Sequence, residues 1–394
     1  MSRRIYMDNA ATSFPKPAAV FEAMADYAKR LGASPGRGAY QEAREAGQLL
    51  DRCRERINLL INGQSSRHVI FTLNTTDALN LGIRGLLQPG HHAITTWLDH
   101  NSVLRPLNAL AASGVEQTRI PCDPTTGLVD PREIERAIQP NTRLIVTLAG
   151  SNVTGTVQPF REIGRVAKDH GIPFLLDAAQ VLGHLPLDVQ RDGIDLLAFP
   201  GHKGLLGPLG TGGLYIRPGV ERQLRTVREG GTGSVSELAI QPDFLPDRYE
   251  AGSHNAIGII GLSEGVGWIL ERGVESIWQH ERSLTRRMLE RLDVGIDGLK
   301  LYGPPTLDHR CGVFSIRVRG YDSPQSLSDA LEQRFGILSR PGIHCAPLAH
   351  QMLKTDQLGG TTRLSFGPFI TEEDVDFAAH ALTQLARARG RLAS

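Results

Sequence analysis

Residues 172–177 read IPFLLD, and residues 194–203 read IDLLAFPGHK. Each stretch is a short, continuous apolar run that ends in an ionisable side chain, Asp177 in the first and Lys203 in the second. Continuous apolar runs of this length are typical of strands buried on both faces of a sheet. The two stretches therefore predict two buried strands, one with a carboxylate at its end and the other with an amine.

The same pattern repeats outward, from about residue 69 to residue 217, where short apolar runs alternate with segments of helical period. Alternating strands and helices favour a mostly parallel sheet with helices on both faces, and ligands bind beyond the carboxyl ends of such strands. We therefore expect one edge of the sheet to collect the polar residues that follow the strands, namely Thr75, Thr76, Asp99, His100, Ser151, Asn152, Asp177, Gln180, His202 and Lys203.

The 394 residues exceed the size at which a single hydrophobic core usually stops growing, which favours two domains. We expect an N-terminal arm over residues 1–16, a large domain over 17–256 and a smaller α/β domain over 257–394. In the small domain, the sequence predicts one or two long helices over 255–293, the strands 312–318 and 362–366, a helix near 323–335 and a closing helix from Thr371.

The bulk composition excludes several classes of protein. With 40% hydrophobic and 22% charged residues, the chain has the composition of an ordinary globular protein. Its formal net charge of +1 is too small to create a positive electrostatic potential that would attract nucleic acid or an anionic membrane. No apolar stretch at the N-terminus resembles a signal peptide, and no window reaches the length of a membrane span. We expect a soluble, cytoplasmic protein.

Cysteine usage indicates reduced thiols. Four cysteines, Cys53, Cys122, Cys311 and Cys345, are scattered without the spacing of a zinc site or of a disulfide framework. We expect no metal, and at most one reactive thiol among the four.

Asp177 and Lys203 together indicate pyridoxal 5'-phosphate (PLP). A lone lysine in a turn is usually a solvated surface residue, but the loop that follows Lys203 is rich in glycine, and a buried carboxylate such as Asp177 needs a partner. PLP chemistry requires a lysine that holds the cofactor as a Schiff base and an acid that keeps the pyridine nitrogen protonated. The pair predicts both roles.

Ten blocks spread over the chain resemble, in order, those of fold type I PLP enzymes of the class V aminotransferase family, within the cysteine desulfurase-like, selenocysteine lyase-related group. They are YMDNAATSFPKP, NTTDALN, LDHNSVLRP, GSNVTGT, DAAQ, PGHKGLLGPLGTGGLY, EGGTGS, YEAGSHN, RPGIHCAP and TRLSFGPFITEEDVD. The resemblance implies a large domain with a mostly parallel, seven-stranded sheet and a smaller C-terminal α/β domain.

The resemblance also implies cofactor ligands at numbered positions. His100 would stack on the pyridine ring, and Asn152 and Gln180 would contact the phenolic oxygen of the cofactor. Its phosphate would be bound by Thr75, Thr76, His202 and, from the neighbouring subunit of a homodimer, Ser253. Helix N-termini of the kind expected at Thr75 and Thr76 bind phosphate through free backbone N–H groups.

Substrate residues are implied in the same way. Arg363 matches the arginine that binds the substrate α-carboxylate, for which its planar fork is suited. Ala10 and Ala11 resemble small residues that line the substrate pocket, where Asn152 and Arg340 would also contact the substrate.

Cys345 stands where group II, short-loop cysteine desulfurases carry their acceptor thiol. The resemblance implies that this thiolate takes sulfur from L-cysteine as a persulfide and releases L-alanine, for delivery to an acceptor protein. Arg340 and His344 flank the cysteine, and as cations they would lower the pKa of the thiol. The relatives typically read GHHC here, whereas this chain has Ile343 in place of the first histidine.

Other functions stay open at this point. The same cofactor supports selenocysteine lyase, cystine lyase or transaminase activity on a related amino acid. A non-catalytic sulfur carrier that kept the fold is a further alternative, although the retention of Lys203, Asp177, His100 and Arg363 disfavours it.

Overall fold

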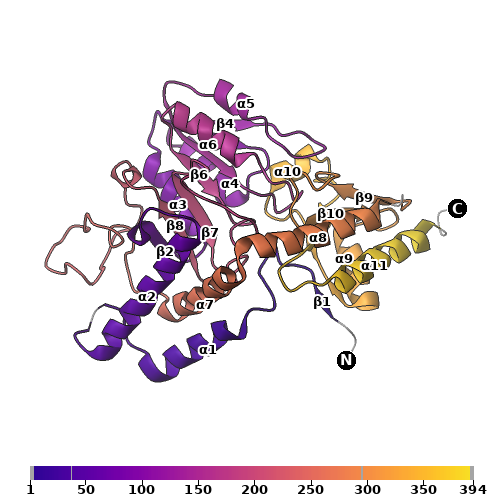
Figure 1. Ribbon diagram of the computed structural model, residues 1–394. Coiled ribbons are helices and arrows are strands. Elements are labelled where there is room, and N and C mark those ends of the chain that lie inside the picture. Colours follow the sequence, from indigo (N-terminus) through magenta and orange to yellow (C-terminus); the bar gives the residue numbers. More distant parts are fainter. Residues whose placement is uncertain (1–3, 37, 294–295, 391–394) are drawn as a thin grey trace.

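The computed structural model describes residues 4–36, 38–293 and 296–390 (Figure 1). Residues 1–3 of the expected arm and 391–394 of the expected small domain lie outside the described residues. Up to residue 216 the elements, which alternate between strand and helix from β2 to β6, are β1 (Ile5–Tyr6), α1 (Ala18–Asp26), α2 (Gln41–Leu60), β2 (Val69–Thr72), α3 (Thr75–Leu86), β3 (His92–Thr96), α4 (Asn101–Ala111), β4 (Glu116–Ile120), α5 (Pro131–Arg136), β5 (Thr142–Leu148), α6 (Phe160–Asp169), β6 (Phe174–Asp177), β7 (Leu196–Pro200) and β8 (Gly212–Ile216).

Beyond β8 the chain forms a long loop and then the elements of a second unit. These are α7 (Ala256–Arg272), α8 (Val274–Leu292), β9 (Leu299–Tyr302), β10 (Val313–Val318), α9 (Pro324–Phe335), β11 (Ile337–Leu338), β12 (Arg340–Gly342), α10 (Pro347–Met352), β13 (Thr361–Ser365) and α11 (Glu372–Gly390). The last helix begins one residue after Thr371, whose hydroxyl accepts a hydrogen bond from the backbone N–H of Asp374, as its capping sequence predicts.

The large sheet has seven strands in the order β2-β8-β7-β6-β5-β3-β4. Only β8 runs antiparallel to its neighbours, so the prediction of a mostly parallel sheet is confirmed. Successive residues of one strand face opposite layers: Phe174 and Leu176 pack in the core shared with α2, α6 and α7, whereas Leu175 packs in the core shared with α3 and α4. Burial on both faces explains why these strands are apolar throughout.

The second unit is built on a four-stranded antiparallel sheet in the order β12-β13-β10-β9. Its core joins Leu284 and Met288 of α8 to Phe314 of β10, Leu364 of β13 and Leu382 of α11. An α/β small domain of this kind was expected from the sequence, and the pairing of β12 with β13 places the loop after Gly342 next to the large sheet.

The domain boundary predicted near residue 256 stays a prediction, and the packing of α7 and α8 bears on where it falls. Helix α7 packs against α1 and α2, and within α8 Ile277 belongs to the core of the large sheet whereas Leu284 belongs to the core of the small sheet. In Figure 1, α8 leads from α7 toward the small unit. We therefore propose a boundary inside α8, because one continuous helix contributes to both cores.

Strand β1 of the N-terminal arm belongs to neither the seven-stranded nor the four-stranded sheet. Strand β1 pairs in parallel with β11, and the backbone of Met7 accepts a hydrogen bond from Ser365 N–H at 2.7 Å. A few residues later, the N–H of Ser13 donates to the carbonyl of His202 at 3.0 Å. The arm thus ties the small domain to the loop that carries Lys203.

Two negative findings apply to the described part of the chain. None of its helices is both long enough and apolar enough to cross a membrane. Over the same residues, no three side chains of the metal-binding types gather closely enough to hold a metal ion.

Gly183 sets the packing of the loop that carries Lys203. Its φ of +87° lies in the left-handed region, and a Cβ atom added there would stand 2.3 Å from the carbonyl oxygen of Gly204. Side chains rarely adopt that φ, and backbone atoms of a neighbouring loop cannot move aside without shifting the loop. Only glycine allows the two loops to pack this closely.

We expect Gly183→Ala to lower the free energy of unfolding by about 3 kcal/mol or more, since it adds a backbone clash to the cost of the left-handed conformation. Gly171→Ala is the matched control: Gly171 also has positive φ, but no atom lies within 4 Å of the added Cβ. That variant should lose only about 1–2 kcal/mol. Chemical denaturation measures both, and equal losses would contradict the packing argument.

Candidate active site

The carboxyl ends of four parallel strands surround one cavity. Strands β3, β5, β6 and β7 end on the same edge of the large sheet, and α3 begins there after β2. The cavity is lined by residues that follow these strands: Asn74, Thr75, Thr76, His100, Ser102, Leu148, Gly150, Asn152, Asp177, Ala179, Gln180, Pro200, His202 and Lys203. The lining therefore brings together the predicted residues Thr75, Thr76, His100, Asn152, Asp177, Gln180, His202 and Lys203, whereas Asp99, Ser151 and Ser253 are not part of it.

Asp177 and Lys203 face this cavity from adjacent strands. Burial lowers the pKa of Lys203 to about 8, and the carboxylate of Asp177 acts in the opposite direction. Burial likewise raises the pKa of Asp177, against a hydrogen bond from Ala179 N–H and the charge of Lys203. Among the described residues, no salt bridge reaches Asp177. A buried carboxylate without a bound cation is suited to a cationic ligand atom.

His100 caps α4 and is neutral. Its Nδ1 accepts a hydrogen bond from the N–H of Ser102 at 3.1 Å and lies 2.9 Å from the Ser102 hydroxyl. Burial lowers the pKa of His100 to about 4, and the nearby charge of Lys203 adds to the effect. The Ser102 hydroxyl also lies 2.7 Å from that of Thr76, so it connects the ring of His100 to the start of α3.

Asp99, next to His100, holds two strand ends together. Its carboxylate accepts hydrogen bonds from the hydroxyl of Thr95, from the N–H and hydroxyl of Thr96, and from Leu148 N–H, at 2.7–2.8 Å. The first two partners belong to β3 and the last to β5. Four hydrogen bonds offset the burial of this carboxylate, and they fix the backbone from which His100 enters the cavity.

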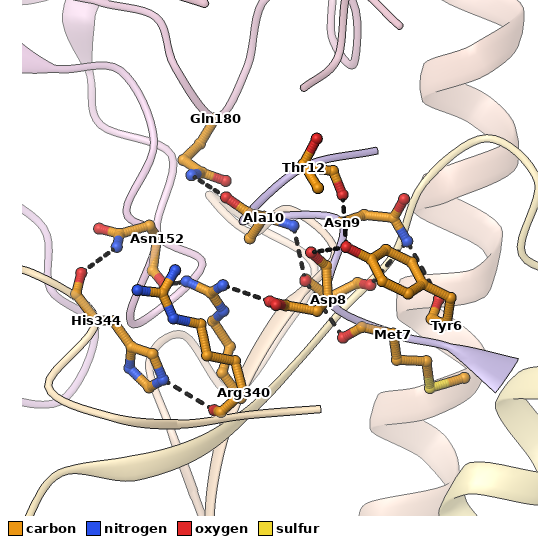
Figure 2. Close-up of polar contacts among 12 residues, drawn as sticks. Tyr6, Met7, Asp8, Asn9, Ala10, Thr12, Asn152, Gln180, Arg340 and His344 are labelled. Atoms are coloured by element: carbon orange, nitrogen blue, oxygen red, sulfur yellow. Dashed lines mark hydrogen bonds and ion pairs between the residues drawn. The ribbon is translucent and has the colours of Figure 1, made fainter. Parts of the chain in front are cut away.

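Arg363 approaches the cavity from β13 of the small domain. It is completely buried, and its Nη2 donates to the carboxylate of Asp8 at 2.6 Å while its Nη1 donates to the carbonyl of Asn152 at 3.1 Å (Figure 2). Its Nε is buried and has no partner among the described residues. Arg340 is the residue directly opposite Arg363 in the β12–β13 pair.

The N-terminal arm brings Ala10 and Ala11 next to Gln180, which lines the cavity. The carbonyl of Ala10 accepts a hydrogen bond from the Gln180 amide at 3.1 Å, and its N–H donates to the Ser365 hydroxyl at 2.8 Å. Ala11 follows in a turn closed by its N–H to the carbonyl of Asp8. Gln180 therefore connects the arm to the cavity, whereas its predicted partner is an oxygen of the cofactor.

Cys345 lies on an exposed loop that is fastened to the cavity. The side-chain amide of Asn152 donates to the carbonyl of His344 at 2.7 Å, and the N–H of Asn101 donates to the carbonyl of Cys345 at 2.9 Å. His344 and Cys345 both have positive φ, 52° and 57°, which is uncommon for residues with side chains. The loop therefore turns sharply and leaves the thiol exposed next to Asn152.

One expectation for this loop is wrong. His344 is not a cation beside the thiol, because it is buried, and burial lowers its pKa to about 2. Its Nε2 lies 3.0 Å from the carbonyl of Arg340, and its ring packs against the fully buried ring of His350 at a centroid distance of 5.6 Å. His344 therefore supports the loop as a neutral group.

Ser253 lies outside the cavity that holds Lys203. It lines a second cavity with Arg228, Glu250, His254 and Asn255, at the end of the long loop between β8 and α7. Within one chain, Ser253 is thus separated from Thr75, Thr76 and His202.

Two residues of this site were not predicted from the sequence. Asp8 binds Arg363, and Ser102 links His100 to Thr76. Asp8 stands in the YMDNAAT block, two residues before Ala10, so its place beside the predicted substrate residues could have indicated a role in the site. Ser102 offered none, because its partners are brought together only by the fold.

The chain is similar to known proteins over nearly its whole length. Residues 5–377 match the family described as aminotransferase class V. A probable cysteine desulfurase of Methanothermobacter thermautotrophicus is 36% identical over 97% of this chain and 94% of its own length, and a cysteine desulfurase of Serratia proteamaculans is 32% identical over 98% and 94%. The apo structure of a cysteine desulfurase from Thermococcus onnurineus superposes with a TM-score of 0.89 at 31% identity, covering 98% of this chain and 95% of that one.

The buried histidines under the Cys345 loop predict acid sensitivity. Burial lowers the pKa of His350 to about 4, below its ordinary 6.5. The unfolded chain then binds more protons between these values, so stability is lost as the pH falls from about 6.5 towards 4. We expect His350→Phe to flatten this loss by about 1 kcal/mol per pH unit.

Denaturation midpoints measured between pH 7 and pH 4 check this expectation. His380→Phe, at an exposed position of α11, is the matched control and should keep the wild-type slope. A slope that His350→Phe leaves unchanged would show that the buried ring does not take part.

Proposed function

Because the chain belongs to the aminotransferase class V family, we propose that it is a PLP-dependent cysteine desulfurase that moves sulfur from L-cysteine to Cys345 and releases L-alanine. The observation that carries the proposal is the attachment of an exposed thiol to the cavity of Lys203: Asn152 lines that cavity and also binds the backbone of the Cys345 loop. Relatives named cysteine desulfurases, at 32–36% identity over nearly the whole chain, support it.

The residues present fit PLP. Asp177 offers an unpaired buried carboxylate to a protonated ring nitrogen, and Lys203 offers an amine. Thr75 and Thr76 open α3, whose N-terminus favours a phosphate although the N–H of Asp77 is bound by the Asn74 side chain, and His202 has a buried Nδ1 without a partner among the described residues. When bound, PLP supplies an electron sink that stabilises negative charge at the substrate Cα.

Lys203 would hold the cofactor and later move the Cα proton. Its lowered pKa of about 8 leaves part of the amine neutral near pH 7, as a general base requires. His100, being neutral and held by Ser102, offers a flat ring for stacking. Asn152 and Gln180 would turn their amides toward the phenolic oxygen, which requires them to exchange their present carbonyl partners.

The substrate would enter between the arm and the small domain. Arg363 would bind the α-carboxylate, Arg340 would add a second cation, and Ala10 and Ala11 would leave room for a small side chain. The register of β12 and β13 puts both guanidinium groups on the same side of the cavity wall. The buried Nε of Arg363, which has no partner among the described residues, favours an anionic substrate.

Sulfur transfer would occur at Cys345. Its thiolate attacks the substrate sulfur, a sulfur–sulfur bond forms, and the bond between that sulfur and the substrate Cβ breaks. The electron pair of the broken bond passes to the substrate carbon, which takes up protons to become alanine. The exposed position of Cys345 suits later delivery of the sulfur to an acceptor protein.

A homodimer belongs to the same proposal. The loop between β8 and α7 projects from the large domain in Figure 1 and exposes apolar side chains, while Leu73 and Leu209 are exposed beside the Ser253 cavity. A second copy on this surface would cover them and would bring Ser253 to the partner's phosphate site. The four free thiols fit the expected cytoplasmic location, where cysteines stay reduced.

We expect Cys345→Ala to lose persulfide and alanine formation from L-cysteine by a factor of about 100 or more while it keeps the visible absorbance of bound PLP, because the variant removes only the nucleophile. Alanine release and persulfide labelling measure the loss. Cys122→Ala, a buried cysteine in the core of the large sheet, is the matched control and should keep its activity.

The same assay separates the alternatives. L-cysteine, L-selenocysteine and L-cystine are compared side by side, with and without a keto acid. Undiminished turnover in Cys345→Ala would contradict the acceptor role and favour a lyase, and dependence on a keto acid would indicate transamination. A protein that gains no visible band with PLP would contradict the proposal altogether.

A further inference from the structure

We propose that Asp8 is a positioning residue, which holds the guanidinium of Arg363 in the orientation that receives the substrate α-carboxylate. This inference rests on the function proposed above. It assigns a role to an arm residue that does not itself line the cavity of Lys203.

The contacts of Arg363 determine how its planar group can lie. Nη2 is bound by the carboxylate of Asp8 and Nη1 by the carbonyl of Asn152, so both ends of the fork are held by the protein. Nε has no partner among the described residues although it is buried. A guanidinium has five N–H groups. The two contacts therefore set its plane and still leave donors for a ligand carboxylate.

The charges around Arg363 explain why its side-chain partner, Asp8, has to be an acidic residue. Arg340 lies directly opposite on β12, and like charges in such a pair repel one another. Asp8 is the acid that forms a salt bridge with Arg363 in the described part of the chain. Without this carboxylate, a completely buried cation would face another cation, and it would be expected to turn away or to shift the strand.

Asp8 is itself held in place by its neighbours. The Tyr6 hydroxyl donates to the carbonyls of Asp8 and Thr12, at 3.2 and 3.0 Å, and closes the turn of the arm (Figure 2). Asp8 also forms a β-bridge with Ser365, two residues beyond Arg363 on the same strand. The backbone of Asp8, from which the carboxylate extends, is thus tied to the strand that carries Arg363.

The chain of contacts continues to the acceptor loop. Arg363 binds the carbonyl of Asn152, and the amide of Asn152 binds the carbonyl of His344, next to Cys345. As long as Asn152 keeps its contact with His344, a guanidinium held by Asp8 has a defined position relative to the Cys345 loop. Binding of the carboxylate in that position would place the substrate sulfur consistently.

The test is Asp8→Asn in the PLP-loaded enzyme, titrated with L-alanine and with ethylamine, which is L-alanine without its carboxylate. Binding is read from the visible absorbance of the bound cofactor. We expect the dissociation constant of L-alanine to rise about 10- to 100-fold, which matches the usual value of a hydrogen bond between charged groups. The constant for ethylamine should stay within about twofold, and Asp8→Glu should recover part of the loss for L-alanine.

Asp297→Asn is the matched control, since it removes an acid from an exposed pair with Arg319 in the small domain and should change neither constant. Equal weakening of both ligands in Asp8→Asn, or unchanged binding of L-alanine, would overturn the proposal. The titration requires no sulfur transfer, so a wild-type enzyme that binds L-alanine but yields no persulfide would contradict the proposed function alone.

Discussion

The common direction of β3, β5, β6 and β7 is the constraint on which the rest of the molecule depends. The carboxyl ends of parallel strands all lie at one edge of the sheet, so the polar residues that follow these strands lie close together. Helices cover both faces of the sheet, so this edge is the place where polar groups can meet a ligand. His100, Asn152, Asp177 and Lys203 meet there for that reason.

The site is further determined by how its buried charged side chains are compensated. Lys203, Asp177, Asp99 and Arg363 are all removed from water, and each is matched in a different way. Asp99 has four hydrogen-bond donors, and Arg363 has an acid. Asp177 and Lys203 influence each other without a salt bridge, which leaves both able to bind a ligand. Buried charged groups that lack a full salt-bridge partner are typical of a binding site, whereas a structural ion pair compensates both of its charges.

The small domain and the arm complete what the large sheet leaves open. Strand β13 supplies Arg363, the loop after β12 supplies Cys345, and the arm supplies Asp8. Asn152 contacts Arg363 through its carbonyl and the Cys345 loop, at His344, through its side-chain amide. One residue at the end of a sheet strand thus connects the cofactor cavity to the substrate arginine and to the thiol loop.

The sequence by itself determined the parallel sheet, the strand-end placement of Asp177 and Lys203, and the family, because apolar runs and local motifs report directly on burial and on backbone turns. Three other features depended on tertiary contacts. His344 was expected to be a cation, but its charge state follows from burial against His350. The acid for Arg363 lies 355 residues away along the chain, and the pairing of β1 with β11 delivers it. The division of the two cores inside α8 follows from packing on both sides of one helix, which periodicity within that helix does not report.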